Sequence, residues 1–283
     1  MAQTIAFYSY KGGVGRSLAL ANAAVLLARR GRRVACIDFD LEASGLHTIF
    51  GIDVPKSQIT VLDILARADI QRSSASITKS LPRSLPGSLS GPLMDLTKHA
   101  QISSSTGKLL LLPTVSEISK IHEALEPQRD LPMLLGRIIE QIENAYNPHV
   151  ILVDSRTGFA ELASPPIRKA DRLVCVLRPN RQNTDGLKML LDIIAAMQNP
   201  PSTFLLLSQV PEIGINDVRI AALESKLGSG RKFDSVIPYD PDLAFEEYVA
   251  AVHAPHSALA KSYEPLAQWL YPQPISRKAS STK

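Results

Sequence analysis

The sequence predicts a single α/β domain: a doubly wound, mostly parallel sheet of about seven strands with helices on both faces. Two observations support this fold class. Short runs rich in Val, Ile and Leu alternate with helical patterns along most of the 283 residues. These runs lack a polar alternation, which indicates strands that are buried on both faces, as in a parallel sheet. A hydrophobic content of 45% is ample for the core of such a domain.

The predicted elements alternate along the chain. Strands are expected at residues 4–8, 33–38, 108–112, 149–154, 172–177, 203–208 and 234–237. Helices are expected at residues 17–30, 59–68, 129–146, 183–198, 215–227, 242–251 and 256–269. Ligands of doubly wound sheets bind at the carboxyl ends of the strands. We therefore expect the functional residues to gather at that edge.

Two segments depart from this alternation. Residues 69–107 are rich in Ser, Pro and Gly, which discourage regular structure. A mobile surface insertion is the simpler interpretation, and a partner-binding loop is the alternative. Residues 271–283 form a polar tail that we expect to be disordered. The folded domain is thus expected to span residues 1–270.

A glycine-rich loop follows the first strand, and residues 10–17 read Tyr-Lys-Gly-Gly-Val-Gly-Arg-Ser. In the related pattern G-x-x-x-x-G-K-[ST], loop N–H groups wrap phosphates, the lysine reaches their oxygens and the hydroxyl holds Mg²⁺. The helix predicted from residue 17 places free N–H groups and the positive end of its dipole at the loop. Strand, basic loop and helix together indicate a nucleotide-phosphate site, and a glycine turn without a ligand is the alternative.

Carboxylates end two of the predicted strands. Asp38 and Asp40 follow the second strand with a spacing of two residues, and Asp154 ends the fourth. Two carboxylates at this spacing face one site if the strand is still extended there. Because carboxylates beside phosphates need a cation between them, the sequence predicts Mg²⁺. A solvated strand end that caps the following segment is the alternative for Asp38 and Asp40.

The run Lys-Gly-Gly-Val-Gly-Arg-Ser resembles the deviant Walker A loop of the ParA/MinD family of ATPases, which belong to the SIMIBI class of P-loop NTPases. It is most similar to the subset that carries arginine before the serine. The resemblance covers nearly the whole chain, from Ile5 to about Leu270, and is most specific in the loop. It implies ATP and Mg²⁺ as ligands, slow hydrolysis, a homodimer with ATP sandwiched between the copies, and an unidentified protein partner.

The resemblance also assigns roles to individual residues. It implies that the phosphates are held by one group of residues, Gly12, Gly13, Val14, Gly15, Arg16, Ser17, Leu18 and Gly158. It implies that Mg²⁺ is held by Ser17, Asp38 and Asp154. It gives the catalytic roles to Lys11, which reaches the partner's phosphates, and to Arg16 and Asp40, the latter positioning the attacking water.

Two departures from the family pattern concern arginines. Arg16 replaces the usual lysine with a wider, forked donor of the same charge, which puts the rate of hydrolysis in question. Arg156 stands where the family's second switch usually has proline. Three interpretations of Arg156 stay open: it stabilises charge at the γ-phosphate, it faces a partner subunit, or it is an ordinary surface arginine.

The loops after the last two strands carry the expected base site. Gln209, Pro238 and Tyr239 lie at these strand ends, and the resemblance implies that such loops grip adenine. An asparagine that the family commonly has after the sixth strand is absent, and Ser208 and Gln209 stand there instead. Ordinary strand-to-helix turns are the alternative.

Composition excludes some classes of protein. The two cysteines lie in apolar runs, which indicates buried thiols in a reducing cytosol rather than a disulfide or a metal pair. No apolar stretch approaches the ~20 residues of a membrane span and no signal peptide is evident, so we expect a cytoplasmic protein. MinD relatives end in an amphipathic membrane helix, but Pro272 and Pro274 oppose one here, so no stable membrane anchor is expected.

The net charge of +4 permits weak contact with nucleic acid but does not require it. Basic pairs such as Arg168-Lys169 and Arg231-Lys232 fit non-specific contact with DNA phosphates or a solvated surface, and we favour the solvated surface. The main functional hypothesis is a nucleotide-driven dimer switch that positions or regulates a partner complex. The alternative is a hydrolysis-defective ATP-binding scaffold, for example in a signalling or defence cassette. Phosphoryl transfer to a small molecule is weaker, because no acceptor pocket is evident.

Overall fold

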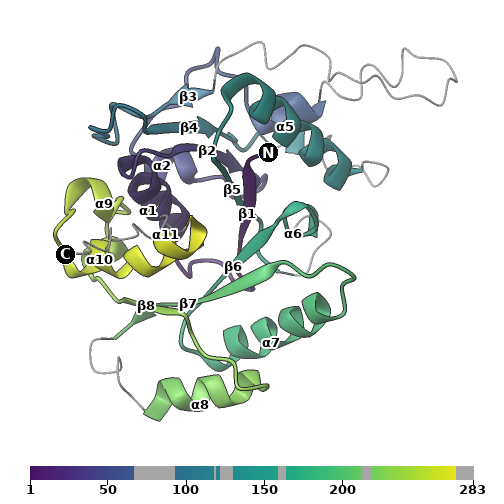
Figure 1. The fold of residues 1–283 in the computed structure, drawn as a ribbon, viewed down its shortest axis with the longest axis vertical. Helices are drawn as coiled ribbons and strands as arrows, with labels where there is room; N and C mark the ends of the chain where they lie inside the picture. The colour runs from purple at the N-terminus through teal and green to yellow at the C-terminus, as the bar shows by residue number, and fades with distance from the viewer. Residues whose placement is uncertain (67–92, 118, 122–129, 159–163, 212–217, 272–283) are drawn as a thin grey trace, which may run out of the picture.

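The structure is a computed structural model that describes residues 1–66, 93–117, 119–121, 130–158, 164–211 and 218–271. Its centre is one eight-stranded sheet with helices on both faces (Figure 1). The strands are β1 (Gln3–Tyr8), β2 (Arg33–Asp38), β3 (Met94–Asp95), β4 (Lys108–Leu112), β5 (Val150–Asp154), β6 (Arg172–Leu177), β7 (Ser202–Val210) and β8 (Ser235–Pro238). Their spatial order is β3-β4-β2-β5-β1-β6-β7-β8.

The predicted fold class is confirmed. Every predicted strand is present, and β7 is longer than expected because it continues to Val210. Among the described strands only β3 is antiparallel to its neighbour, β4. β3 was not predicted from the sequence, because two residues, Met94 and Asp95, are too short a run to show an apolar pattern.

The described helices lie between these strands. They are α1 (Arg16–Arg29), α2 (Leu46–Ile49), α5 (Leu131–Tyr146), α6 (Ser164–Lys169), α7 (Arg181–Ala195), α8 (Val218–Leu227), η2 (Asp242–Ala244, a 3₁₀ turn), α9 (Ala250–His253), α10 (Ala258–Ser262) and α11 (Glu264–Leu270). Residues 61–66 are helical as well. No helix in the described part of the chain is long and apolar enough to span a bilayer.

Two helix predictions near the C-terminus are wrong. The helix expected at 242–251 is replaced by η2, a non-helical stretch and α9, and buried Val249 and Val252 pack in the core around α1. The helix expected at 256–269 is broken at Tyr263. Pro265 lies in the first turn of α11 and has no N–H to continue the hydrogen bonds of α10.

The sheet separates two apolar layers. α1 packs on one face together with α2, α9, α10 and α11, whereas α5, α6 and α7 cover the other face (Figure 1). Alternate side chains of β1 enter both layers: Ile5 and Phe7 pack beneath α1, and Ala6 and Tyr8 pack on the side of α7. This arrangement explains why the strand lacks a polar alternation.

Part of the segment predicted as an insertion belongs to the sheet. Residues 93–107 bury Leu93, Leu96 and Ala100 and contain β3. Gly107 lies so close to α1 that a Cβ there would come within 2.0 Å of the carbonyl oxygen of Ala28. The remainder of that segment, 69–92, and the tail residues 272–283 lie outside the described residues.

Candidate functional site

The loop between β1 and α1 is an open backbone cradle. Gly13 and Gly15 have φ values of 68° and 82°, which only glycine adopts without strain. A Cβ at Gly12 or Gly13 would meet nothing within 4 Å, so space for a ligand adjoins the backbone there. Gly15 caps α1 without a side-chain hydrogen bond, so the N–H groups of its first turn are open to an anion.

The end of β7 holds this loop in shape. The Ser208 hydroxyl donates to the carbonyl of Val14. The Gln209 side-chain amide donates to the carbonyl of Gly13 over 3.1 Å. Ser208 and Gln209, which stand where the resemblance expected an asparagine, therefore both bind the backbone of the glycine loop.

A cavity of about 350 Å³ lies over the cradle. Its wall combines the loop with residues from the ends of β2 and β5. Its lining includes Ser9, Gly12, Gly13, Val14, Gly15, Arg16, Ser17, Leu18, Asp40, Glu42, Arg156 and Thr157. Lys11 is exposed and lies outside the described lining of this cavity.

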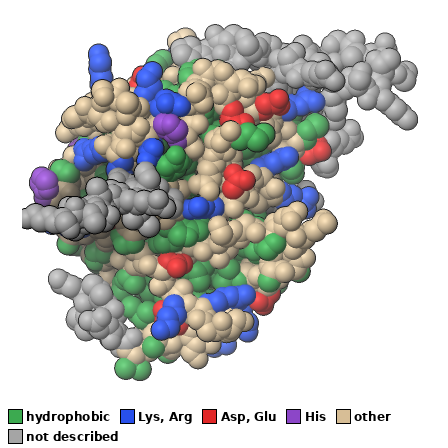
Figure 2. Space-filling view, viewed as in Figure 1, with side chains coloured by type: hydrophobic (Ala, Val, Ile, Leu, Met, Phe, Trp, Pro, Cys, Tyr) green, Lys and Arg blue, Asp and Glu red, His purple; other side chains and the backbone are tan. Residues whose placement is uncertain are grey.

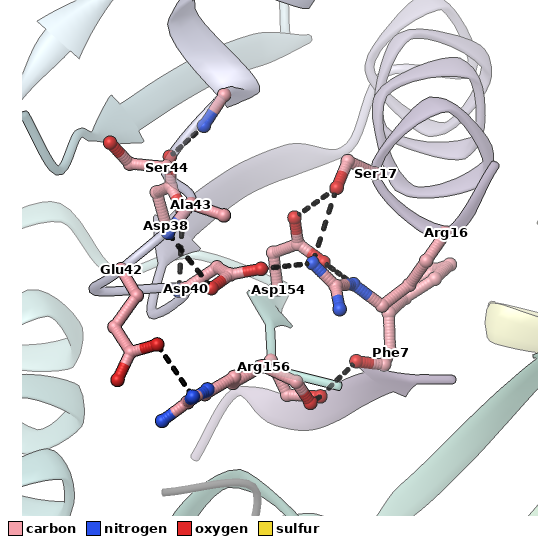
Figure 3. A network of polar contacts seen from close by, with 12 residues as sticks. Phe7, Arg16, Ser17, Asp38, Asp40, Glu42, Ala43, Ser44, Asp154 and Arg156 are labelled. Carbon is pink, nitrogen blue, oxygen red and sulfur yellow. Dashed lines mark hydrogen bonds and ion pairs between the residues drawn. The ribbon is translucent and has the colours of Figure 1, made fainter. Parts of the chain in front are cut away.

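Arg16 does not extend freely into the cavity but joins two strand ends (Figure 3). Its Nε donates to Oδ1 of Asp154 over 2.5 Å, and its Nη2 donates to Oδ2 of Asp40 over 2.8 Å. The side chain is 7% exposed, and Nη1 is buried without a hydrogen-bond partner among the described residues. Burial alone would lower the pKa of Arg16, but the charges of Asp154 and Asp40 raise it overall.

Asp154 also binds the second residue of α1. The Ser17 hydroxyl donates to Oδ2 of Asp154 over 2.5 Å. Burial raises the pKa of Asp154, and the neighbouring Arg16 charge opposes that increase. A hydroxyl and a carboxylate oxygen therefore lie together at the helix end, as an oxygen-binding cation requires.

Asp38 lies behind the cavity. Its carboxylate is fully buried and accepts the backbone N–H groups of Asp40, Gly45 and Leu46 over 3.2–3.3 Å. Burial, and then the charge of Asp154, raise the pKa of Asp38 well above its usual range. In this structure Asp38 therefore caps and shapes the segment that carries Asp40, but it is buried rather than solvated.

The segment after β5 faces the segment after β2 across the cavity (Figure 3). Arg156 Nη2 lies 2.5 Å from Oε2 of Glu42. Gly158 donates its N–H to the carbonyl of Ser9 over 3.3 Å and accepts the Tyr8 hydroxyl over 3.1 Å. The N–H group that the resemblance assigns to the γ-phosphate is thus bound to the protein backbone in this structure.

A second cavity of about 250 Å³ lies at the ends of β7 and β8. It is lined by all three residues predicted for the base, Gln209, Pro238 and Tyr239. The two cavities share Gly13, Gly15, Leu18 and Glu247. The predicted phosphate and base residues therefore border one another along a single edge of the sheet.

The base cavity also contains one residue at a further strand end and two residues that were not predicted from the sequence. Arg178 follows β6 directly, so the rule that ligands bind at strand ends indicates it. Glu247 and Tyr263 come from the C-terminal segment, where the sequence predicted uninterrupted helices. No sequence pattern places these two residues near the loop, because only the packing of that segment on α1 brings them there.

The residues present fit a magnesium-bound nucleotide. The bare glycine cradle, the open first turn of α1 and the unpartnered Nη1 of Arg16 all suit phosphate oxygens. Among the described residues, no group of three or more His, Cys, Asp or Glu side chains forms a metal site. Mg²⁺ commonly uses one or two carboxylates and completes its shell with phosphate and water. Ser17 and Asp154 provide such a partial set.

Comparisons with known proteins agree with this site. The profile of a protein family described as AAA domain matches residues 2–205. An uncharacterized ATP-binding protein of Methanocaldococcus jannaschii is 26% identical over 250 residues, which cover 85% of this chain and 76% of that protein. The chromosome-partitioning ATPase Soj of Treponema pallidum is 23% identical, with 72% and 68% of the two chains covered.

Structural similarity extends further along the chain. The septum site-determining protein MinD of Pyrococcus horikoshii, solved in complex with Mg-ADP, has a TM-score of 0.70 at 20% identity. The match covers 96% of this chain and 97% of that one. At this identity the likeness supports the fold, and the family profile covers most of the sequence. The chain therefore belongs to the AAA domain family that the profile describes and, within it, to the ParA/MinD-type P-loop ATPases.

Proposed function

We propose that the chain is an ATPase that binds ATP with Mg²⁺, dimerises around the nucleotide and acts as a switch that positions or regulates a partner complex. The observation that carries this proposal is the pair of adjoining cavities, one over the glycine cradle and one between the ends of β7 and β8. Together they offer a place for a phosphate tail beside a place for a base. ATP hydrolysis is the activity expected of a member of this family. The proposal also places the protein in the cytoplasm.

The proposal gives each charged residue of the cradle a role. Arg16 exchanges part of its contact with Asp40 and Asp154 for phosphate oxygens when ATP binds. Asp40, freed from the guanidinium, orients the attacking water. Bound Mg²⁺, held by Ser17 and Asp154 with Asp38 behind them, supplies charge neutralisation of the phosphates.

Lys11 links the site to a second copy of the chain. It is exposed and lies outside the described lining of its own cavity, so its ammonium is available to another molecule. We propose that it completes the phosphate site of the partner copy. Loss of the γ-phosphate then removes charge from the interface and weakens the dimer, which resets the switch.

Calorimetry with ATP and Mg²⁺ tests the nucleotide site first. The proposal expects heat of binding at millimolar ATP, and its absence would contradict the assignment. Sedimentation with a non-hydrolysable ATP analogue then tests the dimer. Lys11→Ala is expected to retain binding and lose dimer, whereas Lys98→Ala, at an exposed position on the β3 side, is the matched control and is expected to behave as wild type. An unchanged dimer fraction for Lys11→Ala would contradict the cross-subunit role.

The partner is sought by affinity capture with ATP against ADP, and the proposal expects a protein held in only one nucleotide state. DNA is a weaker candidate. Lys and Arg side chains are scattered among other types over the face shown in Figure 2, rather than gathered in one continuous patch.

A second function is favoured by one observation. Arg16 has two carboxylate partners, Asp40 and Asp154, in this structure. If these contacts persist when ATP is bound, Asp40 cannot orient water and the protein is an ATP-holding scaffold. Single-turnover hydrolysis separates the two functions, because a scaffold shows no turnover that depends on Asp40.

A further inference from the structure

Gly186 lies within α7, away from its ends, and because it has no side chain it leaves a notch in the surface of the helix. A Cβ at this position would lie 2.2, 2.3 and 2.7 Å from the Cγ, Cδ1 and Cδ2 atoms of Tyr10. No real Cβ contact is that short, so the Tyr10 ring fills the space that any other residue's side chain would need. Glycine is unfavourable inside a helix. The close approach of the ring gives a physical reason for a glycine there.

The same ring contacts the neighbouring lysine. Lys11 Nζ lies 5.3 Å from the centre of the Tyr10 ring, within the range of a cation–π interaction. Tyr10 is half-buried and Lys11 is exposed. The ring therefore connects α7, a rigid element of the scaffold, to an ammonium group outside the cavity.

A second tyrosine continues this connection on the other side. Tyr8 is buried in the same apolar layer as α7, and its hydroxyl donates to the carbonyl of Gly158. Gly158 in turn donates to the carbonyl of Ser9. The start of the phosphate loop is thus held between α7 and the segment after β5.

We propose that Tyr10 is a positioning residue for Lys11: seated in the Gly186 notch, it fixes the start of the loop and presents the Lys11 ammonium to a second copy of the chain. This inference rests on the proposed function, in which Lys11 completes the partner's phosphate site. A free lysine loses rotamer freedom when it is immobilised at an interface. A lysine held on an anchored ring has lost part of that freedom in the monomer, so the dimer forms with less entropic cost.

Two substitutions remove the contact from opposite sides. Tyr10→Ala deletes the ring, and Gly186→Ala expels it from the notch. Each is expected to raise the dissociation constant of the dimer formed with a non-hydrolysable ATP analogue by about tenfold, the cost of ordering one long side chain. The dimer is measured at an analogue concentration that calorimetry shows to saturate each variant, so that a loss of nucleotide affinity cannot imitate a loss of dimer. Tyr10→Phe keeps the ring and is expected to dimerise as wild type.

Gly136→Ala is the matched control. Gly136 also lies inside a helix, α5, and its Cβ would meet the flexible end of the Lys169 side chain at 3.2 Å. Because that side chain can move aside, the dimer and the fold are expected to be retained. If Gly186→Ala does not fold, Tyr10→Ala carries the test alone, since it removes atoms rather than adding them.

The outcomes separate this inference from the proposed function. If Lys11→Ala leaves the dimer unchanged, the cross-subunit role itself is wrong. If Lys11→Ala weakens the dimer and folded Tyr10→Ala does not, only the positioning role is wrong. The double variant Tyr10→Ala/Lys11→Ala is expected to lose no more dimer than Lys11→Ala, because Tyr10 acts through Lys11. A larger loss in the double variant would also overturn the inference.

Discussion

Arg16 and Asp154 form a buried ion pair, with 2.5 Å between Nε and Oδ1, at the base of the phosphate loop (Figure 3). The forked guanidinium reaches Asp40 with a second nitrogen, Nη2, at the same time. A lysine has one ammonium and cannot match this fork with two separate nitrogens. The arginine of this sequence thus neutralises two strand-end carboxylates, and it must share or leave them to serve a phosphate.

Removal of Arg16 should destabilise the fold. Arg16→Ala leaves Asp40 and Asp154 buried without their counter-charge, and breaking a buried pair from one side costs about 3 kcal/mol or more. Urea denaturation without nucleotide measures this loss. Arg181→Ala is the control, because its ion pair with Asp185 is exposed on α7 and is worth roughly 0.5 kcal/mol at most. Equal stabilities of the two variants would show that the buried pair contributes nothing.

A methyl group in the cradle should affect binding and not stability. Gly12 has no positive φ, and its Cβ would enter open space, so Gly12→Ala should change the free energy of unfolding by less than about 1 kcal/mol. The methyl occupies space that the phosphates need. Loss of one backbone hydrogen bond to a charged phosphate costs roughly 1.5–3 kcal/mol, so the affinity for Mg-ATP should fall at least about tenfold. Calorimetry and urea denaturation on one preparation check both parts; an unchanged affinity would place the phosphates elsewhere.

Asp40 should be needed for turnover. Asp40→Ala is expected to slow single-turnover hydrolysis by about 100-fold or more, the lower range for a positioned acid–base group. Binding of Mg-ATP should persist, because the cradle and Ser17 are retained. A hydrolysis rate that does not respond to this change would sink the switch mechanism and leave the scaffold function.

The ion pair between Glu42 and Arg156 should limit how well Arg156 serves the phosphates. Both side chains line the phosphate cavity and are partly exposed, at 36% and 28%. Glu42→Ala frees the arginine and should raise the affinity for Mg-ATP, whereas Arg156→Ala should lower it. Each change should be about two- to fivefold, the size of a partly exposed ion pair, and should shrink at high salt. If both variants bind as wild type, Arg156 does not serve the phosphates of its own copy.

Local patterns predicted most of the sheet. The strands that carry the site, β1, β2 and β5, were predicted because they are buried on both faces and therefore read as continuous apolar runs. The fold class was confirmed for the same reason. β3 and the C-terminal helices were missed or misjudged because their structure depends on contacts with α1 and β4, which leave no periodic pattern in a short segment.

The sequence by itself determined the glycine loop, the helix that follows it and the strands that end in carboxylates. These features follow from local composition, which sets the backbone conformation of the loop, the direction of the helix dipole and the sheet edge at which the strands end. Only the tertiary structure decided that Arg16 binds Asp154 and Asp40, that Asp38 lies behind the cavity, and that Tyr10 enters the Gly186 notch. Such contacts join residues far apart in the chain. Their geometry depends on the space that close-packed elements leave for particular side chains. A local sequence pattern carries no information about that space.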